Sequence, residues 1–148
     1  MKVGIMQISS KGRYALRFLL DLCQHQGDGC VPLKAIAERQ DISKKYLEHV
    51  IALLTPTGML KVTRGYQGGY RLNKKPADIT VADVLRITEG TLAPVPCLDD
   101  STTPCARQED CMTRGVWEGL EHVITDYLEG ITLQDILDTY GPGIEYFI

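Results

Sequence analysis

The chain has 148 residues, of which 44% are hydrophobic, 24% charged and 7% aromatic. This length suits one compact domain, or two small units that share a dimer core, and excludes a large multidomain enzyme. No apolar run approaches the roughly 20 residues that cross a bilayer, and no apolar stretch of signal-peptide length precedes Lys11, so we expect a cytoplasmic protein that spans no membrane.

The net charge of −3 hides a strong asymmetry between the two halves of the chain. Residues 1–75 carry 13 Lys and Arg against 5 Asp and Glu, a net of +8, whereas residues 76–148 carry 3 against 14, a net of −11. A basic half joined to an acidic half predicts that the first half binds a polyanion, for which nucleic acid is the natural candidate. The alternative is an uneven distribution without function, or pairing of charges between the halves.

Three short helices are predicted in the basic half. Apolar residues recur at helical spacing over residues 14–23, and the glycine-rich residues 27–29 end this first helix. Pro32 opens a second helix, and Ser43 caps a third. The buried stripe of the third helix is expected to consist of Leu47, Val50, Ile51 and Leu54.

Two strand-like runs follow, residues 59–63 and 70–72, joined by a basic, glycine-rich connection. Three short helices followed by such a hairpin predict a winged helix-turn-helix, in which the third helix enters the major groove of DNA and the hairpin, or wing, reaches the flanking backbone. The predicted DNA contacts are Ser43, Lys44, Lys45, Tyr46 and Glu48 on the third helix and Arg64 on the wing. The alternative for each of these residues, considered singly, is that it is an ordinary solvated surface group with no role in DNA binding.

The acidic half predicts three more helices. Thr80 and Asp83 form a capping-box pattern at the start of the first, a long amphipathic helix is expected over residues 112–129, and Thr132 starts a last short helix. A helix of this length finds few partners within so small a chain, so pairing with the same helix of a second chain is the economical arrangement. The predicted fold is therefore mostly α. It comprises a winged helix-turn-helix domain with a two-stranded wing (1–75), a linker helix with a cysteine loop (76–111), and a long dimerisation helix with a short C-terminal helix (112–148).

Three of the five cysteines, Cys97, Cys105 and Cys111, share one predicted loop with the spacing C-x7-C-x5-C. Thiolates suit zinc or an iron–sulfur cluster, although this spacing is a standard signature of neither. Metal or cluster binding is favoured, with thiol redox switching and inert thiols as the alternatives. A fourth ligand could come from a partner chain or from Asp99, Asp100, Glu109, Asp110, His122, His25, His49 or Glu48. Cys23 falls on the apolar face of the first helix, where core packing is expected.

Several segments together form a recognisable set. They are residues 10–17 (SKGRYALR), 36–39 (IAER), 42–48 (ISKKYLE) and 62–72 (VTRGYQGGYRL), with Trp117 and the Ile131-Thr132-Leu133 run. This set resembles the IscR/NsrR/CymR-type family of dimeric winged-helix transcriptional regulators, and its IscR-like members most closely. The resemblance implies a homodimer that binds a partly palindromic double-stranded DNA operator, with the helix after Ser43 in the major groove and the wing on the minor-groove side. It adds to the predicted DNA contacts Lys11, Arg13, Gly68, Gly69 and Tyr70.

The resemblance also implies that the cysteine triad holds a [2Fe-2S] or related cluster close to the long helix. IscR-like members continue the third cysteine as C-x2-H, whereas this chain has Arg114 at the histidine position. An arginine is permanently protonated and a very poor iron ligand. The first cysteine spacing is also two residues longer here, so the pattern leaves the fourth ligand and the cluster type open.

Glu48 falls where IscR-like proteins carry an acidic residue that disfavours some operator sequences. The alternative is a role in solubility, with an ion pair to Lys44 or Lys45. From the whole sequence we expect a regulator whose DNA affinity depends on an iron–sulfur cluster. The alternative is a cluster-free regulator controlled by thiol redox state or by a protein or small-molecule partner. An enzyme is not expected, because no nucleophile–base pair, phosphate loop or pair of catalytic carboxylates is found.

Overall fold

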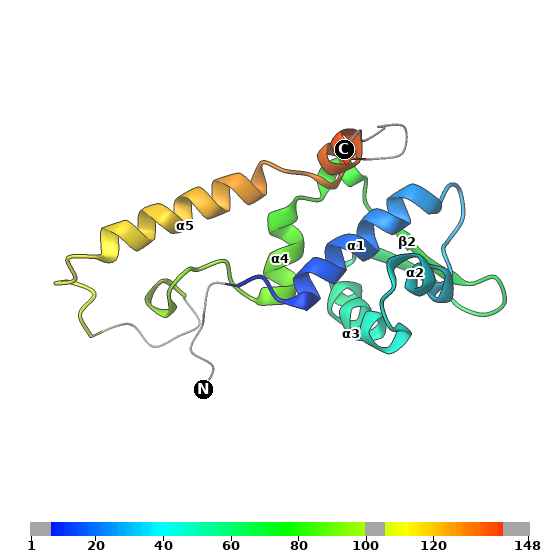
Figure 1. Ribbon diagram of the computed structural model, residues 1–148, viewed down its shortest axis with the longest axis horizontal. Coiled ribbons are helices and arrows are strands. Elements are labelled where there is room, and N and C mark those ends of the chain that lie inside the picture. Colours follow the sequence, from blue (N-terminus) through cyan, green and yellow to red (C-terminus); the bar gives the residue numbers. More distant parts are fainter. Residues whose placement is uncertain (1–6, 100–105, 141–148) are drawn as a thin grey trace.

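The computed structural model describes residues 7–99 and 106–140. In this part of the chain the elements are α1 (Ser10–His25), α2 (Leu33–Gln40), α3 (Lys44–Leu54), η1 (Thr55–Thr57), β1 (Leu60–Thr63), β2 (Gly69–Leu72), η2 (Pro76–Asp78), α4 (Val81–Glu89), η3 (Pro96–Leu98), α5 (Arg114–Glu129) and α6 (Leu133–Tyr140). The η elements are single 3-10 turns. The predicted fold class, a mostly helical winged helix-turn-helix with a two-stranded antiparallel wing, is confirmed (Figure 1).

α1 and α3 begin where a serine side chain satisfies a free backbone N–H group, whereas α2 begins after Pro32 without a side-chain cap. Ser9 Oγ accepts from the N–H of Gly12 at the start of α1, and Ser43 Oγ accepts from the N–H of Tyr46 at 3.1 Å at the start of α3. Between α2 and α3 the chain turns at Asp41, whose left-handed φ of 52° ends α2. The cap predicted at Ser43 is confirmed.

The core lies between the buried faces of these helices. Leu47, Val50, Ile51 and Leu54 of α3 are buried, as the helical spacing predicts, against residues such as Phe18 and Leu22 of α1. The same cluster includes Ile79, Val84 and Leu133 from the acidic half. α4 and α6 therefore complete the core of the winged domain rather than forming a separate unit.

The wing is anchored at its base. β1 and β2 pair from Leu60–Leu72 to Thr63–Gly69, and Val31, which precedes α2, forms a bridge with Tyr70 through hydrogen bonds of 2.8 and 2.9 Å. The ring of Tyr70 packs edge-on against Phe18, with 5.9 Å between centroids. The hairpin is thus held to the core through its second strand.

α4 packs closely on α1. The predicted capping box is confirmed: the N–H of Thr80 donates to the Asp83 carboxylate, and the N–H of Asp83 donates to the Thr80 hydroxyl, both at 3.0 Å. A Cβ on Gly12 would lie 2.6 Å from a Glu89 carboxylate oxygen and 2.9 Å from the side chain of Leu85. Glycine at this position therefore leaves room for the side chains of Leu85 and Glu89, which would have to shift to admit a larger residue.

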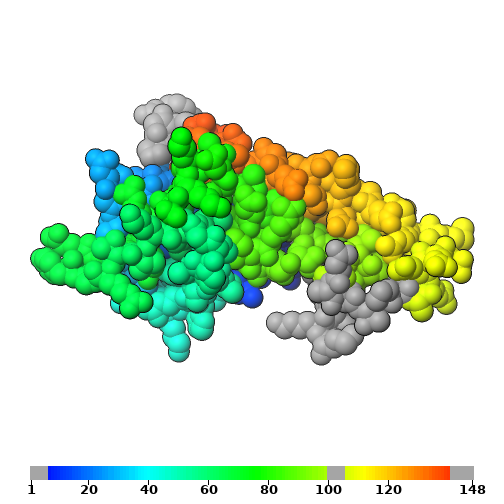
Figure 2. All heavy atoms as spheres, turned by 180° about the vertical axis from the view of Figure 1, so that it is seen from behind, coloured from blue at the N-terminus to red at the C-terminus, as the bar shows by residue number. Residues whose placement is uncertain are grey.

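α5 leaves the winged domain as an arm (Figure 1), and in Figure 2 its N-terminal end and the wing lie at opposite ends of the molecule. The helix begins at Arg114, slightly later than predicted, and none of its residues is buried. After α5 the chain returns to the core, where the N–H of Leu133 donates to the carbonyl of Ile79 at 2.9 Å. Within the described residues no helix is both long and apolar enough to span a membrane.

Candidate nucleic-acid interface and cysteine segment

The outer face of α3 carries the polar groups predicted to contact DNA. Lys44, Lys45 and Glu48 are exposed, Tyr46 is half-buried, and Ser43 caps the helix. No ion pair joins Glu48 to Lys44 or Lys45 among the described side chains. The ion pair of the alternative interpretation is therefore absent among these side chains, whereas its other part, a role in solubility, fits a Glu48 carboxylate that faces solvent.

The other predicted cationic contacts lie on α1 and the wing. Lys11 and Arg13, in the first turn of α1, and Arg64, on the wing, are exposed. None of them forms an ion pair with a described residue. These charges are available to phosphate groups, which would bind them with release of counterions.

The wing tip is a tight, glycine-dependent turn. Gly65 has a φ of 91° and Gln67 a φ of 62°, and the N–H of Gly68 donates to the carbonyl of Gly65 at 2.9 Å. Tyr66, at the apex, is 97% exposed. A Cβ on Gly68 would lie 2.3 Å from the carbonyl oxygen of Thr63, so the backbone itself requires glycine there.

Gly69 and Tyr70 have a packing role that the sequence did not indicate. Gly69 is buried, and a Cβ there would lie 2.3 Å from the carbonyl oxygen of Val31. Tyr70 takes part in the bridge to the same residue. Their predicted role as DNA contacts stays a prediction, whereas their role in seating the wing follows from the contacts.

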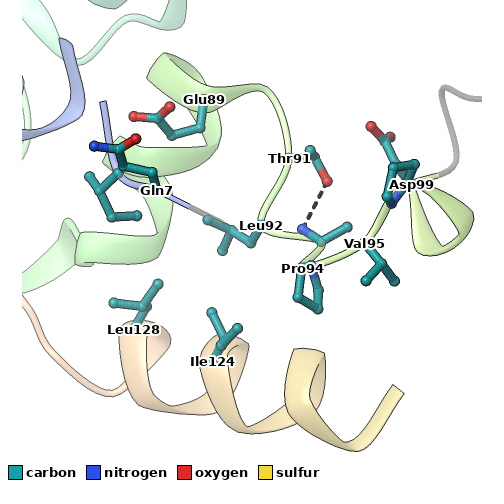
Figure 3. Close-up of a pocket in the computed structure, with 12 residues that line it drawn as sticks. Gln7, Glu89, Thr91, Leu92, Pro94, Val95, Asp99, Ile124 and Leu128 are labelled. Carbon is teal, nitrogen blue, oxygen red and sulfur yellow. Dashed lines mark hydrogen bonds between the residues drawn. The ribbon is translucent and has the colours of Figure 1, made fainter. Parts of the chain in front are cut away.

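The cysteine segment is the stretch between α4 and α5, of which the structure describes residues 91–99 and 106–113. Its first part lies beside the C-terminal half of α5. Cys97 belongs to η3, and Cys111 lies three positions before the first residue of α5. Both are half-buried, whereas Cys105 and Asp100 lie outside the described residues. In Figure 3, Ile124 and Leu128 of α5 point toward the segment that carries Leu92 and Pro94. A cavity of about 340 Å³ separates the segment, α5 and the end of α4. The chain that leads to Cys97 thus lines one side of this cavity, with α5 and the end of α4 on the other sides.

The surroundings of Cys111 favour the thiolate form of its side chain. The hydroxyl of Thr113 lies 3.4 Å from its sulfur, and this hydrogen bond lowers the pKa of Cys111 below the usual thiol value. Backbone N–H groups and the nearby Arg114 guanidinium act in the same direction. The thiolate is the form that both binds metals and reacts with oxidants.

The described residues do not by themselves form a metal site. No group of three His, Cys, Asp or Glu side chains that could hold a metal ion forms within residues 7–99 and 106–140. Among the predicted fourth ligands, His25 contacts Asp21 and His122 pairs with Asp126 at 3.1 Å. Arg114 donates through Nε to Glu118 at 2.8 Å and carries no lone pair for a metal. The thiols fit a soft, thiolate-bound centre, and the histidine position of the C-x2-H pattern contributes no ligand.

The two remaining cysteines lie within the winged domain. Cys23 packs against the core, as predicted, and burial raises the pKa of its thiol to about 11. Cys30, to which the sequence assigned no role, donates through Sγ to the carbonyl of Gln67 at 3.3 Å. Contacts of this kind join residues far apart in sequence, and no local pattern signals them.

Comparison with known proteins agrees with this geometry. Residues 8–139 match the Rrf2 family model, described as an iron-dependent transcriptional regulator. The chain is 36% identical to the HTH-type transcriptional regulator CymR of Bacillus subtilis (strain 168), over 93% of this chain and 94% of CymR. Among solved structures, T. potens IscR superposes with a TM-score of 0.73 at 38% identity, over 95% of this chain and 93% of that one. The structure of CymR, the global cysteine regulator of B. subtilis, has a TM-score of 0.73 at 32% identity, covering 91% of this chain and 98% of that one.

These relatives are transcriptional regulators rather than enzymes, and the matches extend over nearly the whole chain. The protein therefore belongs to the Rrf2 family of transcriptional regulators.

Proposed function

We propose that this protein is a homodimeric regulator that binds double-stranded operator DNA, and that Cys97, Cys105 and Cys111 hold an iron–sulfur cluster, [2Fe-2S] in type, that controls its DNA affinity. The observation that carries the proposal is the arrangement of α3 and the wing. A capped helix with an exposed polar N-terminal turn adjoins a hairpin that is held firmly to the core, as in a winged helix-turn-helix.

DNA contact is assigned by chemistry to two groups of residues. Lys11, Arg13, Lys44, Lys45 and Arg64 supply phosphate contacts, because their charges are exposed and unpaired in the described chain. Tyr46 and Glu48 supply base discrimination. A carboxylate on this face accepts from the amino group of cytosine and repels base acceptors. Glu48 therefore selects against some operator sequences as well as in favour of others.

The dimer is proposed to form through α5. Val116, Leu120, Val123 and Tyr127 recur at spacings of four, three and four residues and so form one stripe along this helix. Within the described chain, Val123 and Tyr127 remain 64% and 67% exposed. On another side of the helix, Ile124 and Leu128 face the cysteine segment (Figure 3). An exposed apolar stripe beside one already covered indicates a second copy of the helix as its partner.

The cluster assignment rests on donor chemistry and on the relatives. Three thiolates suit an iron–sulfur cluster, which would supply one-electron redox chemistry and sensitivity to oxidants. The lowered pKa of Cys111 favours ligation at the start of α5. Because Arg114 is not a ligand, the fourth ligand has to come from another residue of this chain or from the partner subunit.

The cysteine segment is well placed to connect the two functions. It follows α4, which packs on α1 of the winged domain, and it lies against α5. Movement of Cys97 or Cys111 on ligation would displace this segment and with it the angle between α5 and α4. In a dimer joined through α5, that angle sets the spacing of the two recognition helices, and DNA affinity changes only if the two states differ in that spacing.

The test is a visible absorption spectrum with iron and acid-labile sulfide analysis of the full chain purified without oxygen, together with operator binding before and after cluster removal. We expect colour, iron and sulfide in matched amounts, and an operator affinity that changes about tenfold or more between the two states, in the usual range of allosteric coupling. The Cys105→Ala variant should be colourless. A chain that stays colourless after reconstitution, or a Cys105→Ala variant that keeps its spectrum, would contradict the cluster assignment.

A second candidate function is a cluster-free thiol switch, which the chemistry of Cys111 favours. Its thiolate is stabilised by a hydroxyl, and a relative of similar identity, CymR, is the global cysteine regulator of B. subtilis. In the metal-free chain, Thr113→Val should raise the pKa of Cys111 and slow its alkylation at pH 7 about twofold to threefold, because less thiolate is present.

Site-resolved mass spectrometry of iodoacetamide adducts measures this rate over a pH series. Thr113→Ser, which keeps the hydroxyl, is the matched control and should retain the wild-type profile. Equal rates in all three proteins would remove the Thr113 hydroxyl as the cause of Cys111 reactivity.

A further inference from the structure

A buried carboxylate links α1 to the end of α2. Asp21 is fully buried in the middle of α1. Arg39 donates to it through Nε at 3.0 Å and through a terminal nitrogen at 2.7 Å, and Gln40 donates through Nε2 at 2.9 Å. His25 lies on the other side, with 3.5 Å between Nδ1 and the carboxylate. A buried carboxylate requires such partners, because desolvation of an unpaired charge is costly.

Asp21 is therefore ionised in the folded protein. Burial raises the pKa of its carboxyl, but the hydrogen bonds from Arg39 and Gln40 and the charge of Arg39 outweigh burial and hold the pKa below its usual value. An apolar residue at this position would pack the two helices together without constraining their relative orientation. A bidentate arginine and an amide fix both distance and direction.

The hydrogen bonds continue from Gln40 to a second residue of α1. Gln40 Oε1 accepts from Arg17 Nε at 3.1 Å, and the carbonyl oxygen of Gln40 accepts from a terminal nitrogen of the same guanidinium. Gln40 is the last residue of α2, directly before the left-handed turn at Asp41. Both its side chain and its backbone are thus fixed to α1 at the point where the chain turns toward α3.

This series of contacts from Asp21 ends on α3, the recognition helix proposed to enter the major groove. The Arg17 guanidinium lies over the ring of Tyr14, 5.3 Å from its centroid, and Tyr14 meets the ring of Tyr46 edge-on at 5.2 Å. Tyr46 is in the first turn of α3, among the proposed DNA contacts. Tyr14, Arg17 and Asp21 are three and four residues apart, so they lie along one face of α1.

We propose that the Asp21 carboxylate is a positioning group for DNA recognition, which holds the turn between α2 and α3, and the ring of Tyr46, in register with α1. This inference rests on the proposed DNA-binding function and deepens it. In this proposal the network residues do not contact bases themselves; they are Tyr14, Arg17, Asp21 and Gln40. They act by setting how the first turn of α3 is presented to the groove, and so affect discrimination between sequences more than attraction to phosphates.

The test compares specific with non-specific binding by the full chain. The specific probe is a duplex enriched by the wild-type protein from a randomised pool, and the non-specific probe is a scrambled duplex of the same length. The main variant is Gln40→Leu, which removes both side-chain hydrogen bonds but leaves the Asp21–Arg39 pair in place, so that the buried carboxylate keeps a charged partner. We expect the ratio of the two affinities to fall about fivefold to tenfold, because misplaced base contacts lose discrimination while phosphate contacts persist.

Tyr14 provides a matched pair of variants. Tyr14→Phe keeps the ring between Arg17 and Tyr46 and should keep the ratio within about twofold, whereas Tyr14→Leu should lower it like Gln40→Leu. The double variant Gln40→Leu/Tyr14→Leu should fall little further than either single variant, since residues in one network are not additive. Equal loss of specific and non-specific binding, or an unchanged ratio in Gln40→Leu and Tyr14→Leu, would overturn the proposal.

Hydrogen exchange of the free protein separates this inference from the DNA-binding proposal. Gln40→Leu should speed exchange of the amides around the turn, residues 41–46, while those of β2 stay protected. Should the wild-type chain enrich no duplex, the proposed function would be wrong, and the exchange pattern would still decide whether the network holds the turn. Unchanged exchange over residues 41–46 would overturn the positioning role.

Discussion

Replacement of Gly69 by alanine is expected to separate the wing from the segment before α2 and to reduce operator affinity at least tenfold. The added Cβ would lie 2.3 Å from the carbonyl oxygen of Val31, 2.5 Å from its carbonyl carbon and 2.8 Å from the nitrogen of Pro32. All three are backbone atoms, so no rotamer change relieves the contact. The Val31–Tyr70 bridge has to open, or the segment before α2 has to move.

The cost in stability should be about 2 kcal/mol or more, within the upper range for overpacked sites. Thermal unfolding measures it, and fluorescence anisotropy with labelled operator measures the loss of binding. Gly29→Ala is the matched control, because the nearest atom to its Cβ would be 3.9 Å away and its φ is not left-handed. It should stay within about 0.5 kcal/mol of wild type, as surface substitutions usually do. A Gly69→Ala variant as stable as this control would show that the wing is not seated on Val31.

The elements that were predicted correctly are those with a local cause. The cap at Ser43 and the capping box of Thr80 and Asp83 depend on residues three positions apart. The buried stripe of α3 depends on helical periodicity, and the wing on a glycine-rich connection between two strands. Each can be recognised within a dozen residues, because the physical interaction closes within that span.

What the sequence did not reveal depends on contacts between distant segments. Leu133 is fully buried in the core of the winged domain, although it lies 112 positions after Asp21 in the chain and follows the long helix. Asp21 itself reads as a polar interruption in an apolar run. Its partners, Arg39 and Gln40, belong to α2, and only the folded chain brings them into contact with it. Gly69 was predicted to contact DNA, and its packing against Val31 became evident only from the fold.

The cysteine site follows this division only in part, because the hydrogen bond that the sequence did not reveal joins Cys111 to Thr113, two positions away. The sequence indicated the three thiols and the unusual Arg114, whereas the hydrogen bond that lowers the pKa of Cys111 is a matter of local geometry. Cys105 lies outside the described residues, so the ligand set stays a prediction. The position of the segment between α4 and α5 is what relates those thiols to the winged domain and to the helix proposed to join two copies.

Substitution of Val123 by aspartate is expected to convert the proposed dimer into monomers. Its side chain lies in the middle of the exposed stripe on α5 and makes no contribution to the buried core of the described chain. A carboxylate at a buried interface would lose its hydration without gaining a partner. The folded monomer should therefore persist while association fails.

Sedimentation velocity measures the change in mass, and thermal unfolding verifies that the winged domain stays folded. Operator affinity should fall about a hundredfold or more, because two half-sites are no longer bound by one linked pair of recognition helices. His122→Asp is the control, since it places the same charge on the neighbouring position, which is exposed and off the stripe. It loses a surface pair with Asp126 and places a new carboxylate four residues from Glu118 and Asp126, and each of these effects is worth about a few tenths of a kcal/mol.

The two variants together distinguish the stripe from the helix as a whole. Dissociation in Val123→Asp alone would assign the interface to the face of Val116, Leu120, Val123 and Tyr127. Dissociation in both would mean that added charge disturbs α5 itself. A dimer that persists in Val123→Asp would move the interface to another surface, and the coupling proposed between the cysteine segment and the spacing of the recognition helices would then lose its basis, because that coupling requires α5 to join the two subunits.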